Sequence, residues 1–260
     1  MNALSDARRR LIGRLRHRKT RAREALVLVE GVRVVSDLLE AGVRPRFALV
    51  SPRCDALAPD LVGRLHEVTE VVRVDDDTLE SCADTSTPQG VLAVAPEPGG
   101  DWFDRIGPDD RILVLDALQD PGNVGTLVRA AAALGATGVV LLDGSVEPWN
   151  PKAVRASAGA VFRCPLALVQ SDRALERLSR AGLPILVADA SGTDVAPPPW
   201  HGGWALVVGS EGHGVREALR AQAAKTVRVP MAAGVESLNA GVAGSILLYE
   251  LTRHRGGPGA

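Results

Sequence analysis

The sequence predicts two α/β domains, the second built on a parallel sheet with helices on both faces. Short apolar runs of strand length alternate with longer amphipathic segments along the chain, which is typical of α/β architecture. A stretch rich in Pro and Gly interrupts the series, and 260 residues suffice for two separate cores. The expected boundaries are a first domain at 1–95, a linker at 96–110, a second domain at 111–254 and a tail at 255–260.

Composition favours a soluble protein with an aliphatic core. Apolar residues make up 46% of the chain, charged residues 23% and aromatic residues only 3%. No apolar run approaches the roughly 20 residues of a membrane helix, and the N-terminus lacks a hydrophobic signal core. Cys54, Cys82 and Cys164 are widely spaced without a CxxC pair, so we expect reduced core or surface thiols and no metal site. These features predict a cytoplasmic protein that has no membrane partner.

Charge is distributed unevenly. Residues 1–23 carry nine Arg or Lys side chains against a single acid, Asp6, although the whole chain has a formal charge of −1. A basic arm of this kind attracts phosphates and releases counterions when it binds nucleic acid. A solvated, partly disordered terminus is the alternative interpretation.

The elements of the first domain follow from the periodicity of apolar residues. Helices are expected at 4–18, 31–41, 57–66 and 76–81, and strands at 25–30, 47–50, 70–74 and 91–94.

The second domain continues the alternation. Strands are expected at 111–115, 138–142, 164–169, 184–188 and 205–208, with a short β-branched run from Val227. Helices are expected at 126–134, 151–159, 172–181 and 215–221, with a last helix that ends near Leu251. Three polar, Gly-containing loops each follow a strand, at 116–125, 209–214 and 230–239. In parallel sheets ligands bind beyond the carboxyl ends of the strands, so these loops are the expected site.

The 209–214 loop is glycine-rich, but it matches neither GxGxxG nor the P-loop pattern. Its glycines let the backbone approach a ligand closely, and Glu211 places a carboxylate there to accept from hydroxyl or amine groups or to orient an arginine. The alternative is a tight turn in which Glu211 caps the next helix. His213 is interpreted as a solvent-facing loop residue rather than a catalytic base.

The 116–125 loop leads into an apolar helix that contains Arg129. A buried guanidinium is costly unless it is paired, so Arg129 is expected to have a partner. A structural carboxylate would serve, and so would a phosphate or carboxylate substrate. Asn123 meets Arg129 only if it lies in a loop that folds back over the helix.

The last helix is unusual in its small residues. Ser237 and Asn239 are good N-cap residues for its first turn. Gly241 and Gly244 each cost the helix roughly 0.5–1 kcal/mol relative to alanine, which indicates a close approach by another backbone or a ligand.

Together these loops resemble the three ordered motifs of the SpoU-type RNA ribose 2′-O-methyltransferases of the SPOUT superfamily. Residues 111–252 carry the resemblance, and Asn239-Ala240 stands where many members have Asn-Val. The motifs read Asn123-x-Gly125-x-x-x-Arg129, Val207-Val208-Gly209-Ser210-Glu211-Gly212, and Val229-Pro230-Met231 with Glu236-Ser237-Leu238-Asn239. The first domain is similar to an L30e-like RNA-binding domain, through Glu30-Gly31 and Thr87-Pro88-Gln89-Gly90-Val91.

The resemblance implies S-adenosylmethionine as methyl donor, a deep trefoil knot and a homodimer whose active site borrows residues across the interface. It implies that Arg129 contacts the target ribose or phosphate. The remaining implied catalytic residues position the substrate; they are Asn123, Glu211, Ser237 and Asn239. The implied cofactor-binding residues are Gly209, Val229, Met231, Leu238 and Ala188.

The expected activity is therefore methyl transfer to a ribose 2′-hydroxyl, in 23S rRNA, by an enzyme that uses no metal. A tRNA substrate and a non-catalytic RNA- or ribosome-binding protein of the same fold are the alternatives. A dinucleotide-dependent enzyme is disfavoured by the missing fingerprint.

Overall fold

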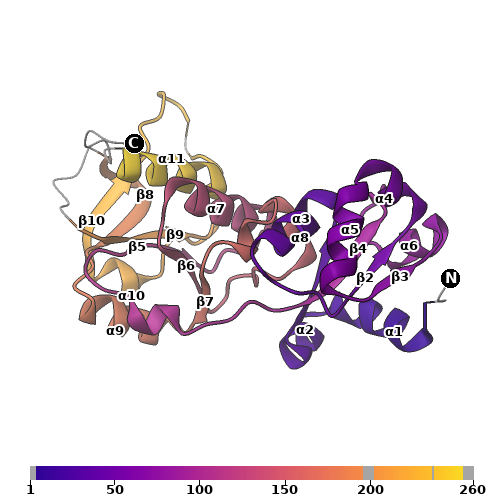
Figure 1. The fold of residues 1–260 in the computed structure, drawn as a ribbon. Coiled ribbons are helices and arrows are strands. Elements are labelled where there is room, and N and C mark those ends of the chain that lie inside the picture. The colour runs from indigo at the N-terminus through magenta and orange to yellow at the C-terminus, as the bar shows by residue number, and fades with distance from the viewer. Residues whose placement is uncertain (1–3, 196–201, 236, 254–260) are drawn as a thin grey trace, which may run out of the picture. The chain divides into compact units, whose positions relative to one another are not determined.

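The computed structural model describes residues 4–195, 202–235 and 237–253, so the expected tail at 255–260 lies outside the described residues. The chain divides into two compact units (Figure 1). The first comprises residues 1–98 and 149–163, and the second comprises residues 99–148 and 164–260.

The first unit contains a four-stranded mixed sheet in the order β1-β4-β2-β3. Strand β4 pairs antiparallel with both β1 and β2, whereas β2 and β3 are parallel. Its helices and strands are α1 (Asp6–Leu15), α2 (Arg18–Glu24), β1 (Leu26–Glu30), α3 (Val32–Glu40), β2 (Phe47–Val50), α4 (Pro52–Leu57), α5 (Pro59–Val68), β3 (Val71–Arg73), α6 (Asp76–Cys82), β4 (Val91–Pro96), α8 (Pro151–Ala156) and η2 (Ala160–Phe162). Helices α2 and α4 are additions to the elements expected from the sequence.

The basic N-terminal segment is folded, so the alternative of a partly disordered terminus is wrong for its described residues. Ile12 and Leu15 of α1 are buried in the first core. Five of the nine basic side chains make hydrogen bonds within the unit. Arg8 binds Glu70, Arg9 binds Ser81, and Arg16 binds the carbonyls of Cys82 and Ala83. Arg21 binds the carbonyl of Leu15, and Arg23 binds Glu24. Arg8, Arg9 and Arg16 thus tie α1 to Glu70 and to the end of α6, while Arg21 joins α2 to α1.

Residues 149–163, which we expected in the second domain, belong to the first unit. Helix α8 packs against β1, and Arg155 pairs with Asp84 at 2.8 Å. The buried carboxylate of Asp37 in α3 accepts from Arg163, and a Cβ at Gly159 would collide with the same side chain. The amphipathic pattern of this segment predicted its helix but not the core against which the helix packs.

The second unit contains six strands in the order β10-β8-β9-β5-β6-β7, and every pairing is parallel. This confirms the predicted parallel α/β class. Its elements are η1 (Trp102–Arg105), β5 (Arg111–Asp116), α7 (Pro121–Leu134), β6 (Gly138–Leu142), β7 (Leu166–Val169), α9 (Ser171–Arg180), β8 (Ile185–Asp194), β9 (Trp204–Gly209), α10 (Glu217–Arg220), β10 (Ala223–Arg228) and α11 (Ala240–Thr252).

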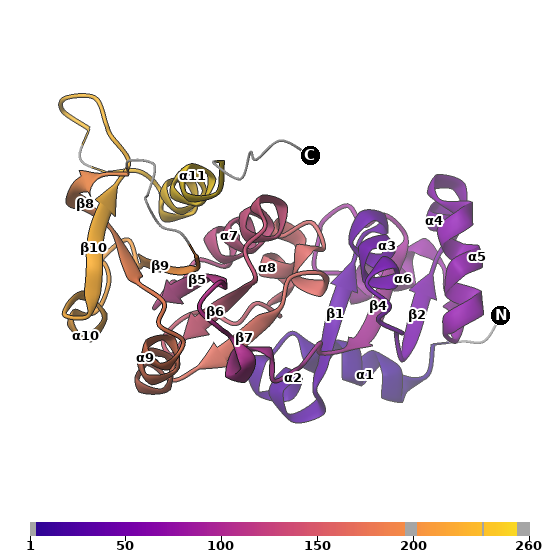
Figure 2. The same ribbon diagram turned by 60° about the vertical axis from the view of Figure 1, so that its left-hand side comes forward.

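Helices cover both faces of this sheet (Figure 2). Helices α9 and α10 pack on one face. Their residues Leu175, Leu178 and Leu219 form one hydrophobic core with every second side chain of the strands. Helices α7 and α11 lie together on the other face, and α11 also contacts β9. The carboxyl ends of the strands therefore meet the N-termini of α7 and α11.

Among the differences from the sequence expectation, three concern the site and the linker. Helix α7 begins at Pro121, because Asp120 caps it by accepting from the Asn123 amide, so Asn123 lies in the helix and not in a loop. Strand β8 runs on to Asp194 and pairs there with β10. Within the expected linker, η1 forms and Phe103 is buried in the second core.

All three cysteines are free and buried. Burial raises the pKa of Cys54 to about 11 and that of Cys164 to about 12, which keeps both thiols protonated and unreactive. No helix among the described residues is long and apolar enough to span a membrane.

Candidate active site

A cavity of about 330 Å³ lies at the carboxyl edge of the parallel sheet. Its walls come from the middle of β8, the ends of β9 and β10, the loop after β10 and the start of α11. We call it the central cavity. The sheet topology explains it, because the carboxyl ends of adjacent parallel strands open onto the same edge.

Most of the expected site residues line the central cavity. All five expected cofactor residues do so, and so do three of the expected catalytic residues. These eight are Ala188, Gly209, Val229, Met231, Leu238, Glu211, Ser237 and Asn239. Asn239 is the N-cap of α11 and accepts from the Val242 amide at 3.2 Å, whereas Ser237 lies in the preceding loop. Glu236 of the third motif lies outside the described residues.

Asn123 reaches the site from α7. Its side-chain amide donates to a carboxylate oxygen of Glu211, which joins the first motif to the second. A Cβ at Gly241 would lie 3.0 Å from the Asn123 side-chain oxygen, so the first turns of α7 and α11 approach closely. A side-chain hydrogen bond and the close approach of α7 and α11 thus bring polar groups of the three motifs together.

Arg129 is placed differently from our expectation. It is exposed on α7, it does not line the central cavity, and among the described residues it makes no ion pair or hydrogen bond. The expectation of burial was therefore wrong, and no carboxylate of the described chain pairs with Arg129; pairing with a phosphate or carboxylate of the substrate stays a prediction. An apolar helix still has one face towards solvent, and Arg129 lies on that face. It also lies six residues beyond Asn123 in the same helix, so the two are not neighbours.

The 209–214 loop is a tight turn, as the alternative interpretation held. Ser210 and Gly214 form a β-bridge, Gly214 has a φ of 68°, and a Cβ at Gly209 would overlap the backbone of Gly214. Glu211 does not cap the next helix, however, because the N-cap of α10 is Arg216 and no side chain caps it. The turn instead presents Glu211 to Asn123.

Sequence reasoning missed Asp189, which also lines the central cavity. The hydroxyl and amide of Ser191 donate to this carboxylate at 2.6 and 2.9 Å, and Arg220 pairs with it. The Ser191 bonds foremost, with Arg220, lower the pKa of Asp189 to about 2. The available signal was its position directly after a buried strand, next to Ala188.

Sequence reasoning also missed Asp116 and Arg216. Asp116 ends β5, is buried, and accepts from the Arg216 side chain at 2.6 Å and from its amide at 2.8 Å. The contact ties the β9 loop to the end of β5, but 100 residues separate the partners, so no local pattern could reveal it.

A parallel sheet whose carboxyl-edge loops enclose a cavity defines an α/β protein that binds a small ligand at that edge. Residues 110–249 match the SpoU rRNA Methylase family, and residues 9–93 match the MRM3-like substrate binding domain. The chain belongs to the SpoU rRNA Methylase family. The family resemblance predicted from the three motifs is confirmed.

Individual relatives agree with this assignment. The chain is 30% identical to the 23S rRNA (guanosine(2553)-2′-O)-methyltransferase RlmP of Bacillus subtilis, over 92% of this chain and 93% of that protein. It is 33% identical to the 23S rRNA (uridine(2479)-2′-O)-methyltransferase of Streptomyces viridochromogenes, over 92% and 86%. The structure of the SpoU methyltransferase AviRb of S. viridochromogenes, solved with the cofactor AdoMet, superposes with a TM-score of 0.85 at 30% identity, covering 96% of this chain and 98% of that one.

Proposed function

We propose that this protein transfers a methyl group from S-adenosylmethionine to a ribose 2′-hydroxyl of 23S rRNA. The observation that carries the proposal is the central cavity, which is walled by residues of the second and third methylase motifs and joined to the first motif by the bond between Asn123 and Glu211. The names of the Bacillus and Streptomyces relatives support 23S rRNA as the substrate class.

The central cavity suits an adenosine-containing cofactor. Its volume of about 330 Å³ falls in the range of small-molecule sites, roughly 300–1,000 Å³. Val208, Val227 and Leu247 supply apolar wall, and Asp189 supplies an ionised carboxylate that accepts from hydroxyl or amine groups. The residues proposed to hold the cofactor, largely through the backbone, are Ala188, Gly209, Val229, Met231 and Leu238. When bound, S-adenosylmethionine supplies a methyl group activated by a sulfonium charge.

The protein's own part in the reaction is alignment. The ribose 2′-oxygen would have to lie in line with the carbon–sulfur bond of the bound cofactor, and an RNA phosphate would take up the hydroxyl proton. Asn123 and Glu211 are fixed against each other and position the ribose, together with Ser237 and Asn239. Arg129 is a protonated, positioning group rather than a base, because a guanidinium does not deprotonate in proteins.

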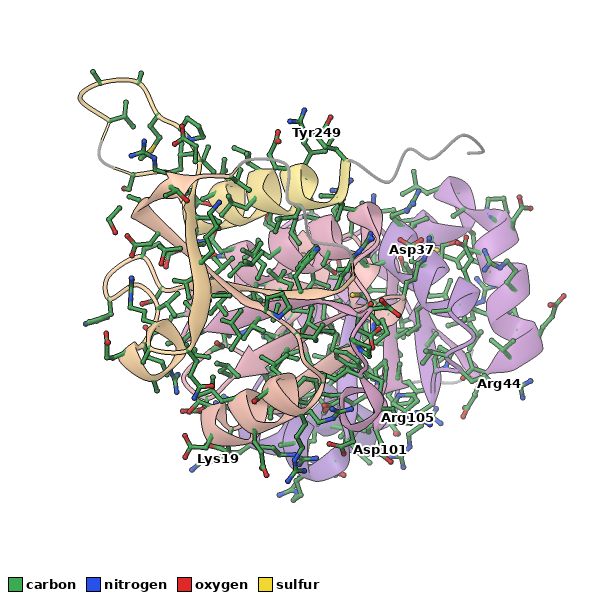
Figure 3. The ribbon with its side chains drawn as sticks, turned by 90° about the vertical axis from the view of Figure 1, so that its left-hand side faces the viewer. Lys19, Asp37, Arg44, Asp101, Arg105 and Tyr249 are labelled. Atoms are coloured by element: carbon green, nitrogen blue, oxygen red, sulfur yellow. The ribbon has the colours of Figure 1, made fainter. Side chains whose placement is uncertain are left out.

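We propose that the active protein is a homodimer. Helix α11 is largely apolar, yet its Val242 and Tyr249 side chains are 46% and 52% exposed. Figure 3 shows Tyr249 on the outer side of the helix. An exposed apolar helix face next to a ligand cavity is typical of an interface. Arg129 lies outside the central cavity of its own chain, which supports a site completed by a second copy.

The trefoil knot and the cytoplasmic location are part of the same proposal. Membership of the SpoU family supports both, because the resemblance implies the knot and ribosomal RNA is a cytoplasmic substrate in bacteria.

The decisive experiment incubates the purified protein with labelled S-adenosylmethionine and either ribosomal or transfer RNA from a strain that lacks the gene. We expect label in 23S rRNA, at a ribose, and none in transfer RNA. Label in transfer RNA alone would move the substrate to that class. Absence of label from both, with no heat of binding for S-adenosylmethionine, would favour a non-catalytic RNA-binding protein.

The first unit offers a basic surface for the RNA backbone. Among the described residues, four of the nine basic side chains of the N-terminal segment make no hydrogen bond or ion pair; they are Arg10, Arg14, Arg18 and Lys19. Arg14 also lines a groove of about 420 Å³ together with Arg46, while the acids of that groove, Glu24 and Glu70, are already paired with arginines. Glu24 also interacts electrostatically with Arg14 and Arg46, but the groove is lined by three arginines and only two acids, and this excess of positive charge suits phosphates.

We expect the double variant Arg14→Gln, Arg46→Gln to bind 23S rRNA more weakly and with a shallower dependence on salt. The slope of log K against log salt falls by about 0.7–0.9 for every phosphate that the protein no longer neutralises. The measurement is a filter-binding titration over a salt series, and the control is Lys152→Gln with Arg105→Gln, which removes two exposed charges elsewhere. Identical slopes for the two double variants would rule out the groove as an RNA-binding surface.

A further inference from the structure

A second cavity of about 320 Å³ shares a wall with the central cavity. Both are lined by Ser210, Glu211 and Gly214, so the β9 loop separates them. We call it the side cavity. Its other walls come from the β5 loop, through Gln119, and from His213, and the mechanism described above uses neither of these side chains.

The floor of the side cavity is a saturated ion cluster. All three side-chain nitrogens of Arg216 donate, to Asp116 at 2.6 Å, to the Asp143 carboxylate at 3.0 Å and to the Asp143 carbonyl at 2.7 Å. The Arg216 bond lowers the pKa of Asp143, which keeps that carboxyl ionised. The Arg216 guanidinium thus ties the ends of β5 and β6 to the β9 loop. Because two carboxylates already neutralise its charge, it is not available to bind an anionic ligand.

The loops that wall the side cavity are held by main-chain interactions, whereas two of their polar side chains make no hydrogen bond among the described residues. Ala117 adopts a φ of 55°, which is uncommon for a residue with a Cβ. The loop is then fixed by the Val146 amide, which donates to the Leu118 carbonyl at 2.7 Å. Gln119 follows, exposed, and neither its amide nor the His213 imidazole has a hydrogen bond within the part of the chain that the structure describes.

Charge decides which ligand fits. Two acids that line the side cavity, Asp116 and Glu211, outnumber its one cation, Arg216, which is also paired with Asp143, so the side cavity repels phosphate. A carboxamide and an imidazole instead offer donors and acceptors to the edge of an uncharged heteroaromatic ring, which is how glutamine and its analogues read bases. The volume is sufficient for a ring of this size.

We propose that the side cavity binds the base of the nucleotide whose ribose is methylated, and that Gln119 and His213 contact its edge. This inference rests on the proposed function. The base is attached to the sugar carbon next to the one that carries the 2′-hydroxyl, so base and methyl donor must occupy neighbouring sites. The shared wall of Ser210, Glu211 and Gly214 supplies that arrangement.

The test uses a 23S rRNA fragment that spans the mapped methylation site, transcribed with each of the four bases at the target position. We expect the wild-type protein to prefer one base, and Gln119→Ala to lower kcat/KM for that base by about 10–100-fold and to flatten the preference. His213→Ala should act in the same direction. The dissociation constant for S-adenosylmethionine should stay within about twofold, since neither side chain lines the central cavity.

Gln222→Ala is the matched control, because Gln222 is an exposed glutamine of the same unit at the opposite, amino-terminal end of β10. If Gln119→Ala and His213→Ala keep the wild-type base preference and kcat/KM, the side cavity is not the base site, although the methyltransferase activity stands. If the wild-type protein methylates no RNA, the proposed function itself is wrong, and this result is obtained with the wild-type protein alone.

Discussion

Replacing Arg129 with Ala is expected to lower methyl transfer by about 10²–10³-fold, the usual effect of removing one preorganised charge from a reacting centre. Folding and the affinity for S-adenosylmethionine should be unchanged. Arg129 is exposed, lies outside the central cavity and supports no other described residue, so its loss leaves no buried partner behind. The measurements are single-turnover methylation of 23S rRNA and calorimetry with the cofactor.

Arg105→Ala is the control for Arg129→Ala, because Arg105 is also exposed and also lacks an ion pair among the described residues of the second unit. It should keep wild-type turnover. Equal turnover of the two variants would remove Arg129 from the site.

The same side chain tests whether the site is shared between two copies. If Arg129 acts on the partner's central cavity, then Arg129→Ala mixed with Glu211→Gln, each inactive alone, regains roughly a quarter of wild-type activity, because half of the dimers are mixed and each holds one intact site. If Arg129 acts within its own chain, every mixed dimer has two damaged sites and the mixture stays inactive. A recovery assay after subunit exchange therefore separates the two arrangements.

The position of the site could be predicted because it depends on topology. Gly209 is the last residue of β9, whereas Met231 and Asn239 lie in the loop that runs from the carboxyl end of β10 to the N-terminus of α11. Once alternating strands and helices imply a parallel sheet, these places must coincide. The motif resemblance then supplied residue roles that periodicity alone could not supply.

The exposure of Arg129 and the packing of α8 could not be predicted for one shared reason. An apolar period shows that a helix buries a face, but it does not show how wide that face is or which sheet covers it. Arg129 lies beyond the edge of the buried stripe of α7, and α8 packs against β1 of the first unit rather than the strands nearest in sequence. The start of α7, in contrast, could have been predicted from the sequence, because Asp120 is a good N-cap residue and Pro121 is a favourable first residue of a helix.

Gly244→Leu is expected to prevent folding of the second unit rather than merely inactivate it. A Cβ at Gly244 would already lie 2.5 Å from the Leu127 side chain and 3.1 Å from the Val208 side chain, so the close neighbours are side chains of α7 and β9 rather than the backbone or ligand first expected. Leucine adds three further carbons to that contact, which makes a loss of at least about 3 kcal/mol in the free energy of unfolding the expected result. Gly244→Ala should be milder, since the end of Leu127 can rotate away.

Urea unfolding and size-exclusion chromatography measure this effect. Gly63→Leu is the matched control, because Gly63 also lies inside a helix but a Cβ there meets nothing within 4 Å. It should leave the protein soluble and stabilise α5 slightly, by up to about 1 kcal/mol, through higher helix propensity. A Gly244→Leu protein that is soluble, dimeric and only inactive would contradict the prediction, because it would mean that α11 can move off α7 and β9 without loss of the fold.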